Sequence, residues 1–348
     1  MLFFLLAVFA VSLAGVKFSG ANEFHKDYLS KDSTAAVNGI FVLLVFLKHV
    51  CDRADLTAGV FDKPYLSFGE GMGQLVVVTF LFYSGYGIMR SIMSKGHDYV
   101  KAIPKKRFLK VLVQYDVAVL LYAALNLILK NKMKFWDLLL SFVGWSSIGN
   151  SNWYVFSILS LYLIVFVSFF LFKGKIYPSL ALSVALTLGL IALLFSVRRP
   201  AYFYNTLVCY CLGMIYAAFK EKIDKAVMKN DVVWLSLLSA VGISFAFSSL
   251  SRHVKTFPHC LWAILFALLV VLLTMKLQFK NELLEYFGKH VFSIYILQRI
   301  PMMIFEKVPK IYANAYVYIA VCFVCTLLIS EVFDRGLNRI GIKKQAFS

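Results

Sequence analysis

A histidine ends one of the long apolar runs of this chain. Every residue from Gly39 to Leu47 is apolar, and Lys48 and His49 follow directly. Titratable groups are costly within a membrane and mark transport pathways or chemistry, and histidine is the side chain best suited to proton transfer near neutral pH. His49 is therefore a candidate general base. The alternative is a ring that lies among lipid headgroups and hydrogen-bonds to lipid or loop.

Two polar residues share the helix expected around His49. Asn38 precedes His49 by eleven residues, which at about 100° and 1.5 Å per residue places it on nearly the same face, roughly 16 Å away along the axis. Asp52 follows His49 by three residues. It is a candidate for the carboxylate that fixes an imidazole tautomer, with a solvated loop acid as the alternative.

A basic cluster forms the second group that points to chemistry. Lys105, Lys106 and Arg107 stand before another apolar run, and Arg90 lies near the end of the preceding run. Guanidinium and ammonium groups bind phosphate oxygens, so these four residues are candidates for holding a cytoplasmic anion. Binding to anionic lipid, fixing of topology and snorkelling are the alternatives.

Polar and aromatic residues are also embedded at the ends of two other apolar runs. An amide beside aromatic rings is typical of an interfacial belt or of a sugar-binding rim. A buried amide beside a guanidinium is difficult to explain by packing alone. These residues are Asn152, Trp153 and Tyr154 in the first run and Tyr295, Gln298 and Arg299 in the second.

The composition identifies the medium in which these residues act. Of the 348 residues, 61% are hydrophobic and only 16% are charged, a balance that indicates an integral membrane protein rather than a soluble domain. In a membrane protein the basic residues that give the formal charge of +18 are expected to collect in the cytoplasmic loops, so nucleic acid is not an expected partner. The six cysteines lie mostly in apolar runs without companion ligands, so they predict small buried side chains and no metal site.

The elements that must position the candidate residues are membrane-spanning helices. Apolar runs of suitable length predict an all-α polytopic bundle of about ten core transmembrane helices plus one extra N-terminal helix. We expect residues 1–30 to form that helix and a short cytoplasmic loop, and residues 31–348 to form one membrane domain. A signal peptide is the alternative for the first run. The runs are Leu2–Val16, Ala35–Val50, Gly71–Met93, Lys110–Leu129, Trp153–Phe172, Pro178–Ser196, Tyr202–Phe219, Val232–Leu250, Pro258–Met275, Leu283–Phe305 and Tyr312–Phe333.

The basic residues predict the orientation of these runs. If the N-terminus faces outside, the loops on the cytoplasmic side hold about twice as many lysines and arginines as the outer loops, in agreement with the positive-inside rule. We therefore expect a multi-pass protein of the cell membrane with a cytoplasmic C-terminus, and we expect His49 at the outer end of its helix. The cytoplasmic charges include the cluster from Lys95 to Lys110 and the tail residues Arg335, Arg339, Lys343 and Lys344.

Taken together, these segments resemble a known family. The blocks from Asn38 to His49, Phe80 to Tyr86, Lys105 to Lys110, Asn152 to Tyr154 and Gly288 to Leu297 resemble, in the same order, the recurring blocks of the integral-membrane acyltransferase family three. The resemblance spans Lys31 to Phe333. The family usually has arginine or lysine where this chain has Asn38, and often a second histidine where it has Gln298.

The resemblance implies an enzyme that moves an acyl group, commonly acetyl from cytoplasmic acetyl-CoA, to a sugar hydroxyl of a cell-envelope glycan or lipid-linked sugar. It implies that His49 is the essential histidine, with Asp52 as its candidate partner and acyl-CoA as a cosubstrate rather than a bound cofactor. Direct transfer and an acyl-histidine intermediate both stay open. The expected donor-binding residues are Asn38, Arg90, Lys105, Lys106 and Arg107, and the expected acceptor-binding residues are Asn152, Trp153, Tyr154, Tyr295, Gln298 and Arg299.

Two other functional classes fit a polytopic chain with embedded polar residues. A transporter or flippase of a lipid-linked sugar would use those residues to line a conduit, and it predicts broken helices at corresponding positions of two halves. A membrane glycan polymerase would normally carry a large outer loop, and no loop of this sequence is long.

Overall fold

The computed structural model of the chain describes residues 2–54, 56, 62–250 and 256–341. Lys343 and Lys344, which contribute to the predicted cytoplasmic charge, lie outside these residues. The described part is helical apart from two strands, β1 (Val16–Phe18) and β2 (Leu277–Phe279). The helices are α1 (Leu2–Leu13), α2 (Lys31–Cys51), α3 (Lys63–Met72), α4 (Leu75–Ile103), the π-helix η1 (Pro104–Leu109), α5 (Lys110–Ile128), α6 (Phe135–Ser141), α7 (Trp153–Leu171), α8 (Ile176–Ser196), the 3₁₀ turn η2 (Ala201–Phe203), α9 (Val208–Val227), α10 (Asp231–Ser249), α11 (Thr256–Lys276), α12 (Glu282–Lys289), α13 (Val291–Leu297), α14 (Arg299–Phe305), α15 (Pro309–Tyr312) and α16 (Ala315–Arg339).

The expected all-helical membrane bundle is confirmed. Eight helical stretches of the described chain are long and apolar enough to cross a membrane. The predicted number is higher for three reasons. The runs of α4 and α5 join through η1 into one stretch, Phe68–Ile128. The twelve residues of α1 extend about 18 Å, less than the roughly 30 Å of a hydrocarbon core. The run Leu283–Phe305 is divided into α12, α13 and α14.

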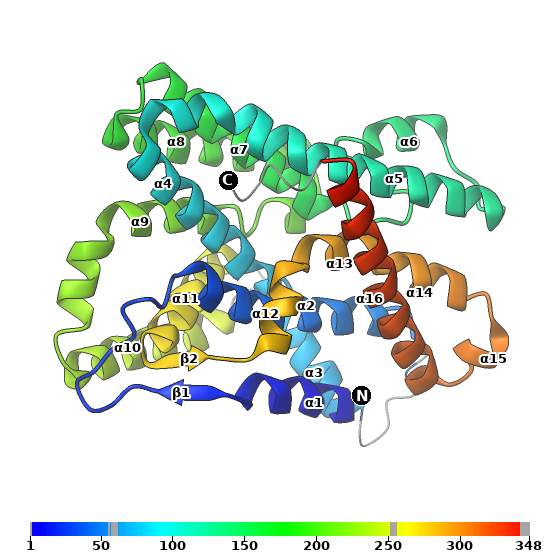
Figure 1. Cartoon of the computed structure of the whole chain (residues 1–348), viewed down its shortest axis with the longest axis horizontal. Helices are drawn as coiled ribbons and strands as arrows, with labels where there is room; N and C mark the ends of the chain where they lie inside the picture. Colours follow the sequence, from blue (N-terminus) through cyan, green and yellow to red (C-terminus); the bar gives the residue numbers. More distant parts are fainter. Residues whose placement is uncertain (1, 55, 57–61, 251–255, 342–348) are drawn as a thin grey trace.

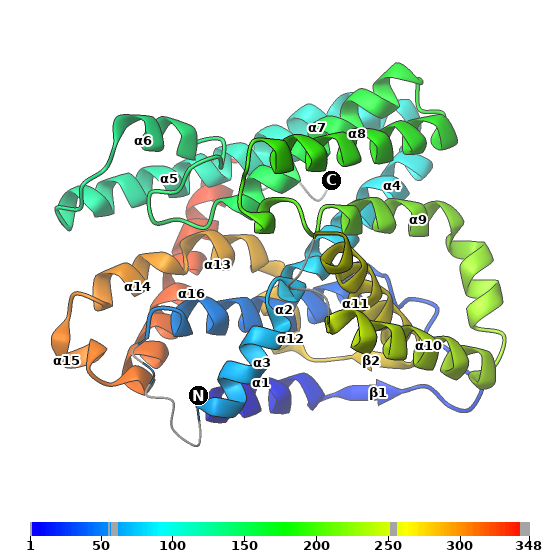
Figure 2. The ribbon, with the colours of Figure 1, turned by 180° about the vertical axis from the view of Figure 1, so that it is seen from behind.

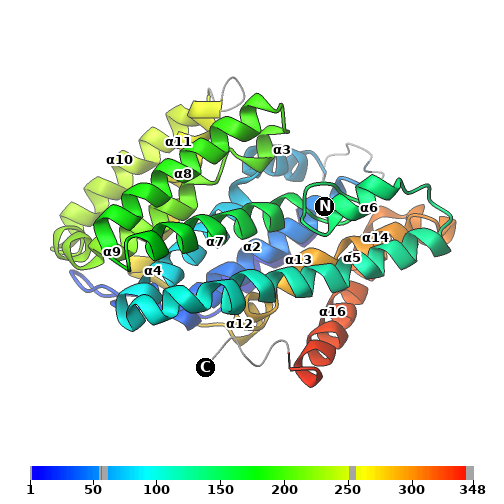
Figure 3. The ribbon, with the colours of Figure 1, turned by 90° about the horizontal axis from the view of Figure 1, so that it is seen from above.

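Several long helices, among them α2, α5, α7 and α8, lie roughly along the longest axis of the molecule, whereas α4 and α16 cross it obliquely (Figures 1 and 2). Helix α2 runs through the middle, and from above it lies between α7 and α13 (Figure 3). Its central residues are almost completely buried, with Val42 and Val50 at 0% exposure. The helix that carries His49 is therefore the core of the bundle.

A reciprocal pair of glycines holds α2 against α12. A Cβ atom at Gly39 would lie 2.0 Å from the carbonyl oxygen of Leu284, and one at Gly288 would lie 1.8 Å from that of Ala35. Neither position can carry a side chain unless the backbones separate. Small residues at such contacts let helices in membranes approach closely.

A second reciprocal pair holds α4 against α9. A Cβ atom at Gly85 would lie 2.0 Å from the carbonyl oxygen of Tyr210, and one at Gly213 would lie 2.0 Å from that of Phe82. Gly87, two residues after Gly85, makes no such contact, because no atom lies within 4 Å of a Cβ added there.

We call the face at the start of α2 the Tyr28 face. There the strands β1 and β2 pair antiparallel, with Val16 opposite Phe279. The Tyr28 hydroxyl donates to Asp224 at 2.6 Å, and the backbone N–H of Asn22 donates to Asp231 at 2.9 Å. All these segments belong to loops expected on one side of the membrane, so the structure supports the alternation of the spans.

We call the opposite face, at the end of α2, the Arg53 face. Arg53 pairs with Glu306 at 2.7 Å, and its carbonyl oxygen accepts a hydrogen bond from the Tyr312 hydroxyl at 2.8 Å. Asn126 donates to the carbonyl oxygen of Ile148 at 2.6 Å. These loops are also expected on one common side.

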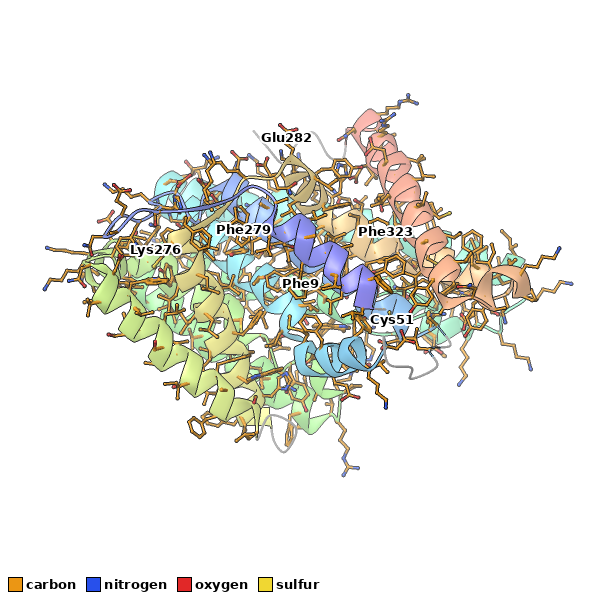
Figure 4. The ribbon with its side chains drawn as sticks, turned by 90° about the horizontal axis from the view of Figure 1, so that it is seen from below. Phe9, Cys51, Lys276, Phe279, Glu282 and Phe323 are labelled. Atoms are coloured by element: carbon orange, nitrogen blue, oxygen red, sulfur yellow. The ribbon has the colours of Figure 1, made fainter. Side chains whose placement is uncertain are left out.

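Helix α1 lies on the periphery of the bundle. From below it crosses beside α2 from the Phe279 region toward Cys51 and α3 (Figure 4). Phe9 packs edge to face on Phe68 of α3, with ring centroids 5.8 Å apart. Phe3 and Leu13 are 62% and 69% exposed, as expected of a helix whose outer side meets lipid. The division of the chain at residue 30 stays a prediction.

Candidate active site

His49 lies in the last turn of α2, at the Arg53 face of the bundle. Its Nδ1 atom is buried without a hydrogen-bond partner among the described residues. Burying an imidazole nitrogen without a hydrogen-bond partner costs free energy. The unpartnered Nδ1 of His49 is therefore consistent with a nitrogen that binds a substrate or accepts a proton during the reaction. The ring packs beside Tyr295 of α13 with centroids 6.2 Å apart.

The break between α13 and α14 brings Gln298 and Arg299 to His49. Gln298 is completely buried, and its Nε2 donates to the carbonyl oxygen of Tyr295 at 3.1 Å. Its Oε1 atom has no partner within the described chain, although the side chain is close enough to interact with the imidazole. The guanidinium of Arg299 also acts electrostatically on His49, and its Nε atom is buried without a partner in the same part of the structure.

The geometry at the end of α2 does not support the expected role of Asp52. The structure places this residue at the C-cap of α2, where its carboxylate pairs with Lys48 one turn earlier. Its side chain is 54% exposed, and the described residues show no hydrogen bond from it to His49. The physical reason is that an i,i+4 ion pair with Lys48 is available at the surface, whereas an approach to the buried Nδ1 would desolvate the carboxylate.

The residues at the start of α7 take different places. The Tyr154 ring packs edge to face on Tyr295, with centroids 5.6 Å apart, and so joins the His49 site. The Trp153 ring packs on Tyr154, with centroids 6.1 Å apart, so Trp153 lies one ring further from His49 than Tyr154 does. Asn152 donates to the carbonyl oxygen of Gly144 at 2.9 Å, an interaction that orders the loop before α7.

A line of tyrosines continues from Tyr154 into the bundle. Tyr154 lies close enough to Tyr162 for their hydroxyl groups to influence each other. The rings of Tyr162 and Tyr210 lie 6.4 Å apart, and the Tyr162 hydroxyl is 3.1 Å from that of Ser84. Phenol rings from α7, α9 and α13 thus form a series that ends beside His49.

Arg107 stands at the other end of this line. Its Nε donates to the Tyr99 hydroxyl at 2.9 Å, and its guanidinium lies near the hydroxyl groups of Tyr162 and Tyr210. The π-helix η1 carries Arg107 between α4 and α5. A π-turn places one more residue in each turn than an α-helix does, and such turns are frequent at functional sites.

The other residues expected to bind the acyl donor are not gathered with Arg107. Arg90, Lys105 and Lys106 are exposed, and they make no ion pair within the described chain, so they are available to an anion in solution or to lipid. Asn38 is half-buried in α2, with its Oδ1 atom buried and without a partner among the described residues.

The sequence interpretation missed several residues of the site. Asn150 donates to the Tyr115 hydroxyl at 2.6 Å, and the Tyr122 hydroxyl donates to the carbonyl oxygen of Ile296 in α13 at 3.1 Å. Both bonds hold the loop and helix that carry Tyr154 and Tyr295. The available signal was the recurrence of single tyrosines within apolar runs, because a buried hydroxyl needs a partner.

No group of three or more histidine, cysteine, aspartate or glutamate side chains is placed to hold a metal ion in the part of the chain that the structure describes. The arrangement supplies a partly desolvated base at His49, an amide and a guanidinium beside it, and a guanidinium at the far end of a tyrosine series. Such a set can take a proton at one end and bind an anion at the other.

Comparison with known proteins adds one finding. The sequence model of a family described as an acyltransferase domain matches residues 36–334, from the second turn of α2 to the last turns of α16. No curated protein and no solved structure gives a significant match.

Proposed function

This chain belongs to the acyltransferase 3 family of membrane acyltransferases, and from this premise we propose that it transfers an acyl group, commonly acetyl, from cytoplasmic acyl-CoA to a sugar hydroxyl of an extracytoplasmic or lipid-linked glycan. The proposal rests above all on His49, whose Nδ1 atom is buried without a partner in the described structure. A nitrogen that no described residue occupies is available to a substrate hydroxyl.

In the proposed reaction His49 takes the proton of the sugar hydroxyl as that oxygen attacks the thioester carbonyl. The new carbon–oxygen bond replaces the carbon–sulfur bond, and the proton passes from the imidazole to the departing coenzyme A thiolate. General base catalysis of this kind contributes about 10²–10⁴-fold.

The donor would bind with its phosphates at the Tyr28 side of the bundle and its acyl group at the Arg53 face. Arg107 is the proposed inner contact for a phosphate, with Arg90, Lys105 and Lys106 outside it. The flexible arm would follow the tyrosine series toward His49. Two facts support this route: Arg107 donates to Tyr99 inside the bundle, and Tyr295 packs on both Tyr154 and His49.

The acceptor would lie at the Arg53 face, against Tyr154, Tyr295, Gln298 and Arg299. The unpartnered Oε1 of Gln298 can accept a bond from a sugar hydroxyl. Asn152 and Trp153 support this surface from one layer behind, because their contacts are with Gly144 and Tyr154.

Mass spectrometry of envelope polysaccharides from cells with and without the protein tests the function. We expect an acyl mass difference on a glycan, and isotope from labelled acetyl-CoA should appear in that acyl group. Glycans that are identical in both cells, together with a lipid-linked sugar that fails to cross the membrane without the protein, would contradict acyl transfer and favour a flippase.

Cysteine labelling tests the orientation. We expect a membrane-impermeant thiol reagent to modify Lys132→Cys in intact cells and to spare Ala102→Cys until the cells are opened. The six native cysteines are buried or half-buried, so the unmodified chain gives the background. The reverse pattern would place His49 on the cytoplasmic side and overturn transfer to an extracytoplasmic glycan.

A further inference from the structure

A polar cavity of about 510 Å³ opens on the Arg53 face. Its walls come from four parts of the chain: the segment that follows α2, the connection from α5 to α6, the loop before α7, and the end of α14. The lining residues that carry charge are Arg53, Lys132, Lys134, Asp137, Glu306 and Lys307.

The charge of this cavity is positive and only partly compensated. Arg53 pairs with Glu306 at 2.7 Å. Lys132, Lys134 and Lys307 are exposed, and they form no ion pair within 4 Å among the described residues, so Asp137 alone opposes them. Uncompensated cations around a concave surface focus the field and attract anions.

The walls of the cavity are fixed by hydrogen bonds and packing. Asn126 donates to the carbonyl oxygen of Ile148 at 2.6 Å, and Asn131 donates to Oδ1 of Asn126 at 2.9 Å. Gly149 has a φ of 110°, and the place of its missing Cβ lies 2.7 Å from Sδ of Met303. A side chain at Gly149 would clash with Met303 and push the loop away from α14.

The cavity lies next to the candidate base. Arg53 lines the cavity, and its charge also reaches the His49 ring. A Cβ atom added at Gly149, on the cavity wall, would lie 3.9 Å from the Tyr122 ring, and Tyr122 bonds to α13 just before Gln298. A molecule in the cavity can therefore place another of its groups near His49.

We propose that this cavity binds an anionic group of the acyl acceptor, so that the substrate class is an acidic sugar or a sugar phosphate whose free hydroxyl faces His49. The inference rests on the proposed acyl transfer and adds the charge of the acceptor to it. The polar lining fits a hydrated sugar rather than a lipid tail. The phosphates of the donor have their own proposed site beside Arg107, near the opposite end of the bundle.

Calorimetry with the full-length protein in nanodiscs tests the binding. Glucose 6-phosphate and glucuronate represent the two anions, and glucose is the neutral match of both. We expect one or both anionic sugars to bind, with an affinity that falls as salt concentration rises, and glucose to bind at least ten-fold more weakly. Equal affinities for all three sugars would overturn the proposal.

Lysine variants locate the binding. The double variant K132Q/K307Q should weaken binding of the anionic sugar by about ten-fold, because it removes two charges that assist hydrogen bonding. K310Q is the matched control, since Lys310 is an exposed lysine of the adjacent α15 outside the cavity lining. Binding that is equally strong in the double variant, or equally weakened by K310Q, would show that the cavity is not the site.

Two further results separate this inference from the proposed function. If the protein acetylates a neutral glycan at the same rate in K132Q/K307Q, the function stands and the inference is wrong. If coenzyme A displaces the anionic sugar from the unmodified chain, and K132Q/K307Q weakens the binding of coenzyme A itself, the cavity belongs to the donor and the inference is wrong. If coenzyme A does not displace the bound anionic sugar from the unmodified chain, the result supports separate sites for the donor and the acceptor.

Discussion

Two surface cavities of similar size lie at opposite ends of α2 and carry opposite charge. The cavity on the Arg53 face has a volume of about 510 Å³, and one on the Tyr28 face has about 440 Å³. The first is lined by one arginine and three lysines with two acids. The second is lined by Asp27, Asp32, Glu282 and Glu285 with one lysine.

Three of the four acids of the second cavity have a structural explanation. Asp32 lies in the first turn of α2, and Glu282 and Glu285 lie in the first turn of α12. Negative side chains stabilise the N-terminal ends of helices. The lysines of the first cavity have no such explanation, because neither α5 nor α14 has a basic residue in its last turn.

We relate this difference in charge to the donor and the acceptor of the proposed reaction. Charge at the acidic cavity stabilises the helices and would repel the phosphates of coenzyme A, so under the proposed function we expect the donor to enter the Tyr28 side elsewhere, near Arg107. Charge at the cationic cavity serves no helix and lies beside His49. Substitutions at the two ends of α2 should therefore have different effects, and we expect the largest effect at His49.

His49→Gln should lower acyl transfer by about 10²–10⁴-fold, because it removes the base and keeps a polar side chain of similar size. Asp32→Asn, at the acidic cavity, should change the rate by less than about two-fold. The measurement is incorporation of labelled acetyl groups into glycan at equal amounts of folded protein. Transfer that survives in His49→Gln would remove His49 from the chemistry.

Arg107→Gln should raise the donor KM by about ten-fold or more, since a charge-assisted bond to phosphate is worth about 1.5–3 kcal/mol when well formed. Lys225→Gln is the control, because Lys225 is an exposed lysine on the same side. Coenzyme A binding by calorimetry gives an independent measure. An unchanged heat of binding in Arg107→Gln, with reduced membrane insertion, would assign the cluster to topology instead.

Tyr28→Phe should destabilise the Tyr28 face by about 1–3 kcal/mol at neutral pH, because the hydroxyl bonds to Asp224 at 2.6 Å and lies 2.8 Å from that of Tyr216. Tyr312→Phe, which removes a bond to a backbone carbonyl on the Arg53 face, should have a smaller effect. Thermal unfolding in detergent compares the two.

Burial, with Tyr216 and Asp224 nearby, raises the pKa of Tyr28 far above its usual range. A raised pKa means that the folded state favours the neutral phenol. The resulting stability is fully present below the unfolded pKa of about 10 and is lost as pH rises above it. The alkaline loss of stability should therefore be smaller in Tyr28→Phe than in the unmodified chain. Equal pH profiles would show that Tyr28 ionises without cost.

Asn38→Arg should have the smallest effect. It restores the basic residue that the family usually has, and we expect unchanged activity or a few-fold tighter donor binding, because one added charge near the route of the donor contributes modestly when partly solvated. Donor KM is the measurement. A large loss of activity would show that the unpartnered Oδ1 of Asn38 has a role that a cation cannot replace.

The sequence was sufficient to predict most of the spans, because the thickness of a membrane fixes the length of an apolar run. The run Trp153–Phe172 differs from α7 by one residue. The breaks at His290 and Gln298 were not predicted, because hydropathy continues across them. The pairing of β1 with β2 joins three-residue strands about 260 residues apart in sequence, and no local pattern reports such a contact.

The sequence also indicated most of the side chains that meet at His49. Tyr154, Tyr295, Gln298 and Arg299 converge there because polar groups inside a bundle gather where they can share contacts. Their roles stay predictions. The exact partners were not predictable: Asp52 pairs with Lys48 instead of His49, and Arg53, which the sequence did not single out, lines the cavity and lies close enough to act electrostatically on the His49 ring.

The reciprocal glycines determine which parts of the bundle can move. At Gly39 and Gly288 the backbones of α2 and α12 meet directly, so a rocking motion that parted these helices would leave a gap that no side chain is present to fill. The same holds for α4 and α9 at Gly85 and Gly213. We therefore expect these two pairs to move as rigid units, so that any motion that gives a substrate access to His49 takes place at other contacts of the bundle.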